Sequence, residues 1–298
     1  MTIAVSGANG RLGRALLAAL GSQAEPWTRP EIDLDRPETL ARLVHARRPA
    51  AVVHAAAWTD VDGCARNPTL AMIRNRDATA AVASACRDLG ADLVYVSTNE
   101  VFDGHWTNGR GFDVDDATNP ASVYGASKLA GEDAARAAFA AGPDRAVTSP
   151  RLGIVRTAWL FGPGAPDFPR KILAAAERAR TAGEPLRVVA DEWGNPTYVA
   201  DLAGAIVELL RSGVLAGTHH VVNGLFASRS QWAMYVLARA GLDVRIEEVP
   251  STMRDRPSTP PRWGVLASSP LPSGRALRPW PDAMAAYAPL MLARARPT

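Results

Sequence analysis

Near its start the chain reads Ile3-Ala4-Val5-Ser6-Gly7-Ala8-Asn9-Gly10-Arg11-Leu12-Gly13. Residues 3–5 are apolar and predict a short strand, and the alanine- and leucine-rich stretch 11–20 predicts a helix. Three glycines at every third position join the two, as required where backbone turns sharply and approaches a pyrophosphate closely. A plain tight turn is the alternative, but a strand before the glycines and a helix after them are the context of a dinucleotide site. We predict cofactor contacts from Gly7, Asn9, Gly10, Arg11, Leu12 and Gly13.

The segment after the expected second strand bears on the choice of cofactor. It reads Trp27-Thr28-Arg29, where an acid would suit the ribose hydroxyls of NAD and an arginine the extra phosphate of NADP. Arg29, helped by Arg11, favours NADP(H), with NAD(H) as the alternative, and Asp33 is the nearby acid that we also assign to the cofactor site. A solvated surface arginine would explain Arg29 equally simply.

Beyond this turn the chain alternates short apolar runs with helical segments. Strands are expected at 51–54, 93–97 and 152–157, and helices at 37–47, 79–89 and 126–140. Such alternation predicts a Rossmann-type α/β fold, a doubly wound parallel sheet covered on both faces. After residue 158 the pattern loosens. We expect helices at 172–181, 201–211 and 231–240, short strands at 186–189 and 220–223, and mostly loop from 250 to 281.

The returning strand at 220–223 implies two interleaved parts. We predict a dinucleotide-binding domain of residues 1–157 plus about 197–224, and a substrate-binding lobe of residues 158–196 plus 225–298.

The stretch Tyr124-Gly125-Ala126-Ser127-Lys128 spaces a tyrosine and a lysine four residues apart. This spacing places both side chains on one face of a helix, where an ammonium would lower the tyrosine pKa from about 10. The tyrosine would then exchange a proton with a carbonyl or alcohol oxygen. Only Lys128 and Lys171 are lysines among 33 basic residues, so a chance pair is rare, although a simple surface pair is the alternative.

Thr98 ends the apolar run Leu93–Ser97, at the edge of the sheet where ligands bind. Its hydroxyl would donate a hydrogen bond to a substrate carbonyl oxygen as negative charge develops there. The alternative is that the hydroxyl only caps the strand.

Composition excludes other classes of protein. The net charge is only +3 and no basic run occurs, which argues against nucleic acid as a partner. No apolar run approaches the roughly 20 residues of a membrane helix, and no signal peptide is recognisable. We therefore expect a cytoplasmic protein without a membrane partner.

Several stretches together resemble the extended short-chain dehydrogenase/reductases, and more narrowly the dTDP-4-dehydrorhamnose reductase family. Besides the glycine turn they are residues 54–62 (HAAAWTDVD), 97–104 (STNEVFDG), 123–132 (VYGASKLAGE), 156–162 (RTAWLFG) and 191–197 (DEWGNPT). They cover nearly the whole chain and are more specific than the glycines or the Tyr–Lys pair alone.

The resemblance implies a role for each of a set of residues. Thr98, Tyr124 and Lys128 would be catalytic, and Tyr124 and Lys128 would also touch the cofactor. Further cofactor contacts would come from Ala55, Ala56, Ala57, Asn75 and Ser97. The sugar-nucleotide would contact Thr59, Val61, Glu100, Phe102 and Trp159, although simple core packing would also explain Trp159.

The implied reaction is NAD(P)H-dependent reduction of a sugar-nucleotide ketone, by default a dTDP-4-dehydro-6-deoxysugar. The chain departs from the family in having Asn99-Glu100 where Asp-Tyr is usual, and Glu100 would place a carboxylate near a diphosphate. Ala15 stands where some members use a glutamate for a metal-bridged dimer, so we expect no metal and a homodimer without one.

Two other functions stay open. A dehydratase on the same fold would need an acid–base carboxylate pair beside Thr98, where Asn99-Glu100 offers one acid, and an epimerase would hold its NAD tightly. A non-catalytic, cofactor-binding regulatory subunit would share the fold without the reaction.

Overall fold

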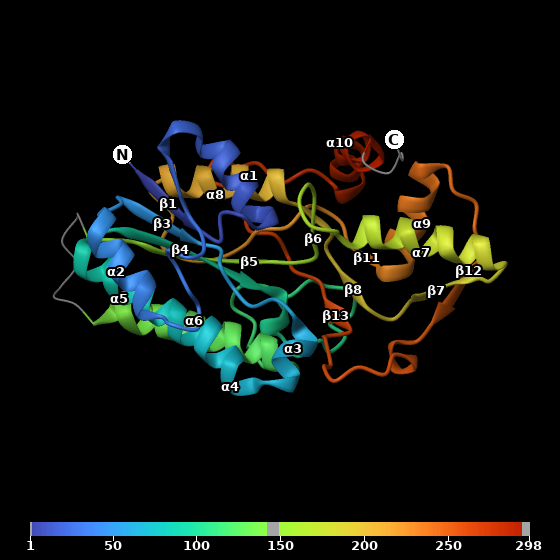
Figure 1. Cartoon of the computed structure of the whole chain (residues 1–298), viewed down its shortest axis with the longest axis horizontal. Coiled ribbons are helices and arrows are strands. Elements are labelled where there is room, and N and C mark those ends of the chain that lie inside the picture. Colours follow the sequence, from blue (N-terminus) through green and yellow to red (C-terminus); the bar gives the residue numbers. More distant parts are fainter. Residues whose placement is uncertain (1, 142–148, 294–298) are drawn as a thin grey trace.

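The computed structural model describes residues 2–141 and 149–293, and in them the central sheet is parallel throughout. Its strands, in spatial order, are β10 (Gly217–His220), β5 (Leu152–Thr157), β4 (Asp92–Thr98), β3 (Ala51–His54), β1 (Ile3–Ser6) and β2 (Ala24–Trp27). The order of the chain reverses beside β1, which creates the crevice where ligands bind in such sheets. Helices cover both faces (Figure 1), which confirms the predicted Rossmann-type fold.

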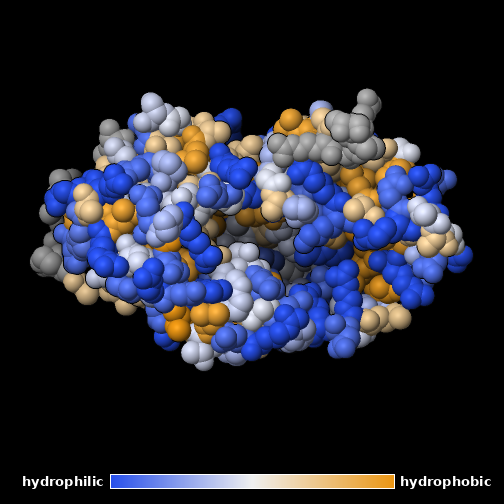
Figure 2. All heavy atoms as spheres, in the orientation of Figure 1, coloured by the Kyte–Doolittle hydropathy of each residue, from blue (hydrophilic) through white to orange (hydrophobic). Residues whose placement is uncertain are grey.

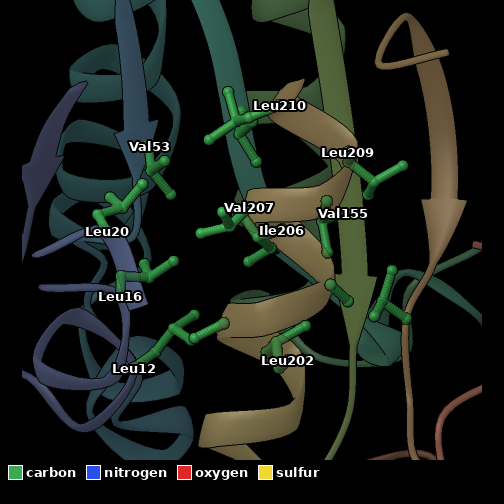
Figure 3. Close-up of a cluster of buried hydrophobic side chains, with 14 of the residues drawn as sticks. Leu12, Leu16, Leu20, Val53, Val155, Leu202, Ile206, Val207, Leu209 and Leu210 are labelled. Carbon is green, nitrogen blue, oxygen red and sulfur yellow. The ribbon is translucent and has the colours of Figure 1, made fainter. Parts of the chain in front are cut away.

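One face of the sheet packs against helices α1 (Arg11–Leu20) and α8 (Val199–Arg211). Leu12, Leu16 and Leu20 repeat at helical spacing along α1 and point toward Leu202 and Ile206 of α8 (Figure 3). This apolar stripe holds the start of α1, and with it the glycine turn, against the edge of the sheet.

The other face packs against α2 (Glu38–Arg47), α5 (Ala78–Leu89) and α6 (Val123–Ala140). The short helices α3 (Val61–Arg66) and α4 (Pro68–Ala71) lead into a π-helical turn at Met72–Asp77, which continues into α5. The sequence pattern did not predict this turn. It buries Asn75, and π-helical turns of this kind are often found at functional sites.

A smaller lobe lies at the far end of the molecule (Figure 1). It is built from α7 (Phe168–Ala182), α9 (Arg229–Ala240) and α10 (Trp280–Ala293), which share one apolar core. Strand β7 (Leu186–Val189) pairs in parallel with β12 (Ile246–Val249). Short pairings join β8 (Trp193–Gly194) to β11 (Ala227–Ser228) and β13 (Trp263–Gly264), and β6 (Leu160–Phe161) to β9 (Thr197–Tyr198). The residue boundaries proposed for the two parts stay a prediction.

Several predicted elements need correction. The sixth strand is β10 rather than residues 220–223: the amide of Val221 makes the last hydrogen bond to β5, at 2.9 Å to the Arg156 carbonyl. The chain then leaves the sheet because the Asn223 amide binds the backbone of Tyr198 at 2.7 Å and the carboxylate of Asp201 at 2.8 Å.

The remaining corrections concern helix starts and missed elements. Helix α6 begins at Val123, three residues before the predicted start, and α7 begins at Phe168 rather than Ile172, in each case after a side-chain N-cap. Strand β12 and helix α10 were missed, and β13 lies inside the stretch expected to be loop. In the described ranges no helix is both long and apolar enough to cross a lipid bilayer.

We expect Gly13→Ala to destabilise the fold, because the added methyl would lie 2.2 Å from the carbonyl oxygen of Gly7. Such overpacking costs about 1–3 kcal/mol and should lower the Tm by several degrees in a thermal melt followed by circular dichroism. The matched control is Gly204→Ala in α8, where no atom lies within 4 Å of the new methyl. It should leave the Tm unchanged or raise it, so an equal fall in both variants would contradict the packing argument.

Candidate active site

A cavity of about 670 Å³ opens at the carboxyl-terminal edge of the parallel strands. Figure 2 shows a recess in the middle of one face, between the half of the molecule that carries the sheet and the smaller lobe. Most of the predicted site residues line the cavity: Gly7, Asn9, Gly10, Arg11, Leu12, Gly13, Arg29, Ala55, Ala56, Ala57, Thr59, Val61, Ser97, Thr98, Glu100, Tyr124, Lys128 and Trp159. Segments far apart in the sequence thus meet in one concave site.

The glycine turn fits a phosphate group. Gly7 has a φ of 70°, and a Cβ there would lie 2.9 Å from the backbone of Ala56, so β1 and β3 approach as closely as glycine allows. The amide of Gly10 closes the turn on the Gly7 carbonyl at 2.8 Å. Gly10 is also the N-cap of α1 and has no side chain to occupy the first N–H groups of the helix. These donors and the helix dipole therefore face the cavity, where they suit an anion.

The charged residues near the glycine turn are placed differently from one another. Arg29 is exposed and lines the cavity together with Thr28. Arg11 donates from Nε to the carbonyl oxygen of Gly162 at 3.2 Å, so it ties the turn to the loop after β6. Asp33 does not line the cavity, because its carboxylate binds Arg36 at 3.2 Å and the amide of Asp35 at 3.1 Å. Its assignment to the cofactor stays a prediction that the geometry does not favour.

The three predicted catalytic side chains come from two adjacent elements. Thr98 ends β4, and Tyr124 and Lys128 lie in the first turns of α6, whose N-cap Ser122 accepts from the amide of Gly125 at 3.0 Å. The hydroxyl of Thr98 accepts from the amide of Glu100 at 3.2 Å. All three line the cavity.

The electrostatics of this group differ from the sequence-based prediction. Burial raises the pKa of Tyr124, the carboxyl of Glu100 raises it further, and the nearby Thr98 hydroxyl acts the other way. Burial lowers the pKa of Lys128 to about 7, against a smaller opposing effect of Glu132. The direction for Tyr124 is opposite to that predicted because burial has the largest effect on its pKa. Nζ of Lys128 donates to the carbonyl of Val96 at 2.8 Å.

Glu100 brings a carboxyl group into the cavity. It accepts a hydrogen bond from the hydroxyl of Ser122 at 2.8 Å, and within the described residues no ion pair involves it. Burial raises its pKa, while Ser122, Arg229 and Arg256 act in the opposite direction. A half-buried carboxyl without an ion-pair partner is costly for stability, which points to a role at the site.

Trp159 lies at the end of the cavity that faces the smaller lobe. Its backbone has a positive φ of 44°, and the guanidinium of Arg229 stacks over its ring at 3.6 Å. Arg229 also pairs with Glu192 at 3.4 Å. The indole is therefore held in place and still lines the cavity, which combines the packing and the binding interpretations.

Two further predicted residues lie outside the cavity lining. Asn75 is buried, accepts from the amide of Trp58 at 2.8 Å and donates to the Ser127 hydroxyl at 2.9 Å, so it ties the segment after β3 to α6. Phe102 stacks on Phe112 with ring centroids 4.4 Å apart. Their assigned contacts stay predictions, and the geometry supports positioning rather than direct contact.

Sequence reasoning missed other residues that line the cavity: Thr28, Ile32, Leu34, Val96, Asn99, Thr157, Ala158 and Leu160. Thr157 had a detectable signal, because it ends a predicted strand just as Thr98 does, and the two are register partners in the sheet. Its buried hydroxyl has no hydrogen-bond partner in the described part of the chain.

Beneath the site lies a buried ion pair. Arg156 of β5 donates to both carboxylate oxygens of Glu132 in α6, at 2.9 and 2.8 Å, and the hydroxyl of Ser97 adds a bond of 2.7 Å.

In residues 2–141 and 149–293 no group of three or more His, Cys, Asp or Glu side chains is arranged to hold a metal ion.

Comparison with known proteins identifies a family. The model of the RmlD substrate binding domain family matches residues 1–291. A dTDP-4-dehydrorhamnose reductase from Streptomyces griseus is 35% identical, over 98% of this chain and 94% of its own length. A dTDP-4-keto-6-deoxy-D-glucose reductase from Streptomyces niveus is 36% identical, over 88% of this chain and 87% of its own length.

Solved structures agree with the sequence relatives. A dTDP-4-dehydrorhamnose reductase from Clostridium acetobutylicum superposes with a TM-score of 0.88 at 29% identity, covering 98% of this chain and all of the other. The Bacillus anthracis enzyme, solved in complex with NADP, gives a TM-score of 0.85 at 28% identity, over 96% of this chain and 99% of its own. From the family model and the full-length relatives together, the chain belongs to the RmlD substrate binding domain family.

Proposed function

We propose that this chain is an NADPH-dependent reductase of a sugar-nucleotide ketone, with a dTDP-4-dehydro-6-deoxysugar as the substrate class. The observation that carries the proposal is the convergence of Thr98, Tyr124 and Lys128 on the cavity that starts at the glycine turn. Its relatives include two kinds of dTDP-keto-sugar reductase, which supports this substrate class.

The residues divide the chemistry among them. When bound, the nicotinamide cofactor supplies the hydride. Tyr124 donates the proton to the substrate oxygen, and its raised pKa keeps the hydroxyl protonated until that transfer. Thr98 donates a hydrogen bond to the same oxygen as charge develops. Lys128, with its pKa lowered to about 7, would hold the sugar of the cofactor and would support Tyr124 when protonated.

We propose a cytoplasmic enzyme that acts on a nucleotide-activated sugar, without a nucleic-acid or membrane partner. We propose a homodimer that needs no bridging metal, because Ala15 in α1 offers no ligand for one.

Replacing Tyr124 by Phe should lower kcat about 10²- to 10⁴-fold, because the proton donor is lost while the ring is kept. The assay is NADPH oxidation at 340 nm against TDP-, UDP- and GDP-linked 4-keto-sugars. Tyr235→Phe is the matched control, since that hydroxyl bonds the Pro281 carbonyl in the smaller lobe and does not line the cavity. Unchanged turnover in Tyr124→Phe would remove Tyr124 as the donor.

The same assay separates the alternatives. An epimerase or dehydratase would convert the sugar without net NADPH oxidation and would release tightly held NAD on denaturation. A regulatory subunit would bind NADPH but would not oxidise it with any keto-sugar in the panel.

Arg29→Glu should raise the KM for NADPH about ten- to a hundredfold and leave the KM for NADH nearly unchanged, because only NADPH carries the extra phosphate. The control is Arg42→Glu, the same change of charge on the exposed side of α2, where the side chain is 71% exposed. An equal effect of the two variants would show a general loss of positive charge rather than a phosphate contact.

Glu100→Gln should lower the KM for the nucleotide sugar by up to about tenfold, because removing a carboxylate reduces repulsion of the diphosphate. Steady-state kinetics at two salt concentrations measure the effect, which should shrink at high salt. A large fall in kcat instead would show that the carboxyl takes part in acid–base chemistry, as a dehydratase requires.

A further inference from the structure

Lys128 rests on an aromatic ring. Its side chain is almost wholly buried, with the residue 2% exposed, and Nζ lies 4.1 Å from the centroid of the Tyr95 ring in β4. Nζ also donates a hydrogen bond to the carbonyl of Val96, which follows Tyr95 in the same strand. An ammonium over the face of an aromatic ring is attracted by the ring quadrupole, most strongly where water is excluded.

The ring of Tyr95 is fixed at its far end. The residue is fully buried, and its hydroxyl donates to the main-chain carbonyl of Lys128 at 3.2 Å. Gly131 leaves the space for this contact, because a Cβ at that position would lie 2.5 Å from the Tyr95 hydroxyl oxygen. The ring therefore touches both the backbone and the ammonium of the same lysine.

A row of residues across the sheet supports the ring from behind. Ser6, His54 and Tyr95 are register partners on β1, β3 and β4. The Ser6 hydroxyl bonds Nδ1 of His54 at 2.7 Å, and the His54 ring lies 6.0 Å from that of Tyr95 at an angle of 21°. Burial, with help from Lys128, lowers the pKa of His54 to about 3. His54 is thus neutral and adds no repulsion at neutral pH.

The other titratable groups near Lys128 form no ion pair with it in the described residues, which leaves the Tyr95 ring as a partner for its charge. On α6 these are Tyr124 and Glu132, one turn to either side, and on the strands they are Tyr95 and His54. Glu132 attracts the ammonium, but its oxygens are already engaged by Arg156, Arg136 and Ser97. In the described residues Lys128 forms no ion pair, so the ring face and one carbonyl hold its charge.

We propose that Tyr95 is a positioning residue for the reaction: its ring holds the Lys128 ammonium at the floor of the cavity, beside Tyr124. The catalytic meaning of this contact rests on the proposed reductase function, whereas the contact itself can be tested without turnover.

The ionisation of Lys128 can be followed separately by NMR, because Lys128 and Lys171 are the only lysines of the chain. Protein labelled with ¹³C at lysine Cε gives one signal for each in a pH titration by NMR. Lys171 is exposed on α7 and serves as an internal reference, and Lys171→Arg assigns the remaining signal to Lys128.

Tyr95→Leu removes the ring, and Tyr95→Phe keeps the ring while removing the hydroxyl. In Tyr95→Leu the ammonium loses its partner, so the Lys128 midpoint should fall by about one pH unit. In Tyr95→Phe it should stay within a few tenths of the wild-type value. A midpoint in Tyr95→Leu equal to wild type, or equal shifts in both variants, would overturn the proposal.

Ring-current shifts keep the test valid if Tyr95→Leu fails to fold. The Lys128 ε-protons should resonate upfield of those of Lys171 in both wild type and Tyr95→Phe, and their absence from that position would overturn the proposal.

Kinetics then link the contact to catalysis. The acidic shift of the Lys128 midpoint in Tyr95→Leu should appear in the pH profile of kcat, and Tyr95→Phe should restore the wild-type profile. A profile that does not move would overturn the positioning role. If the wild-type protein reduces no keto-sugar at all, the proposed function fails, while the NMR titration still decides whether the ring holds the lysine.

Discussion

The site depends on a buried ion pair beneath it, between Glu132 of α6 and Arg156 of β5. A buried charge is tolerated only when its bonding capacity is filled. Here Arg156 binds both carboxylate oxygens, and Ser97 and Arg136 add one bond each, at 2.7 and 2.8 Å. The arginines and Ser97 accordingly lower the pKa of Glu132 against the effect of burial. Because Lys128 lies one turn before Glu132, the pair also fixes where the helix presents Tyr124 and Lys128 to the cavity.

Around this ion pair, the parallel sheet brings the residues of the site together. Strand ends at the same edge bring together the glycine turn after β1, the alanines after β3, the hydroxyl residues of β4 and the segment after β5. The smaller lobe closes the site from the other side, where Trp159 is held by the Arg229 guanidinium at 3.6 Å. The sheet edge therefore carries the side of the cavity with the glycine turn, and the boundary with the lobe carries Trp159.

Much of this was predictable from local pattern. Apolar runs and helical spacing gave the five central strands β1–β5 apart from details of their ends, and the helices on both faces. Elements whose partner lies far along the chain were harder. Strand β12 exists through its pairing with β7 about 60 residues away, and β10 stops at His220 because Asn223 is drawn to Tyr198 and Asp201. No window of local sequence contains those partners.

The sequence by itself determined the glycine turn and the spacing of Tyr124 and Lys128, because a tight turn and one face of a helix are set by neighbouring residues. Only the tertiary structure decided what each side chain meets. It turned Lys128 onto the Val96 carbonyl and the Tyr95 ring, and it left Asp33, Asn75 and Phe102 outside the cavity lining. Burial and contacts between distant segments set these outcomes, and both arise when the chain packs rather than from local spacing.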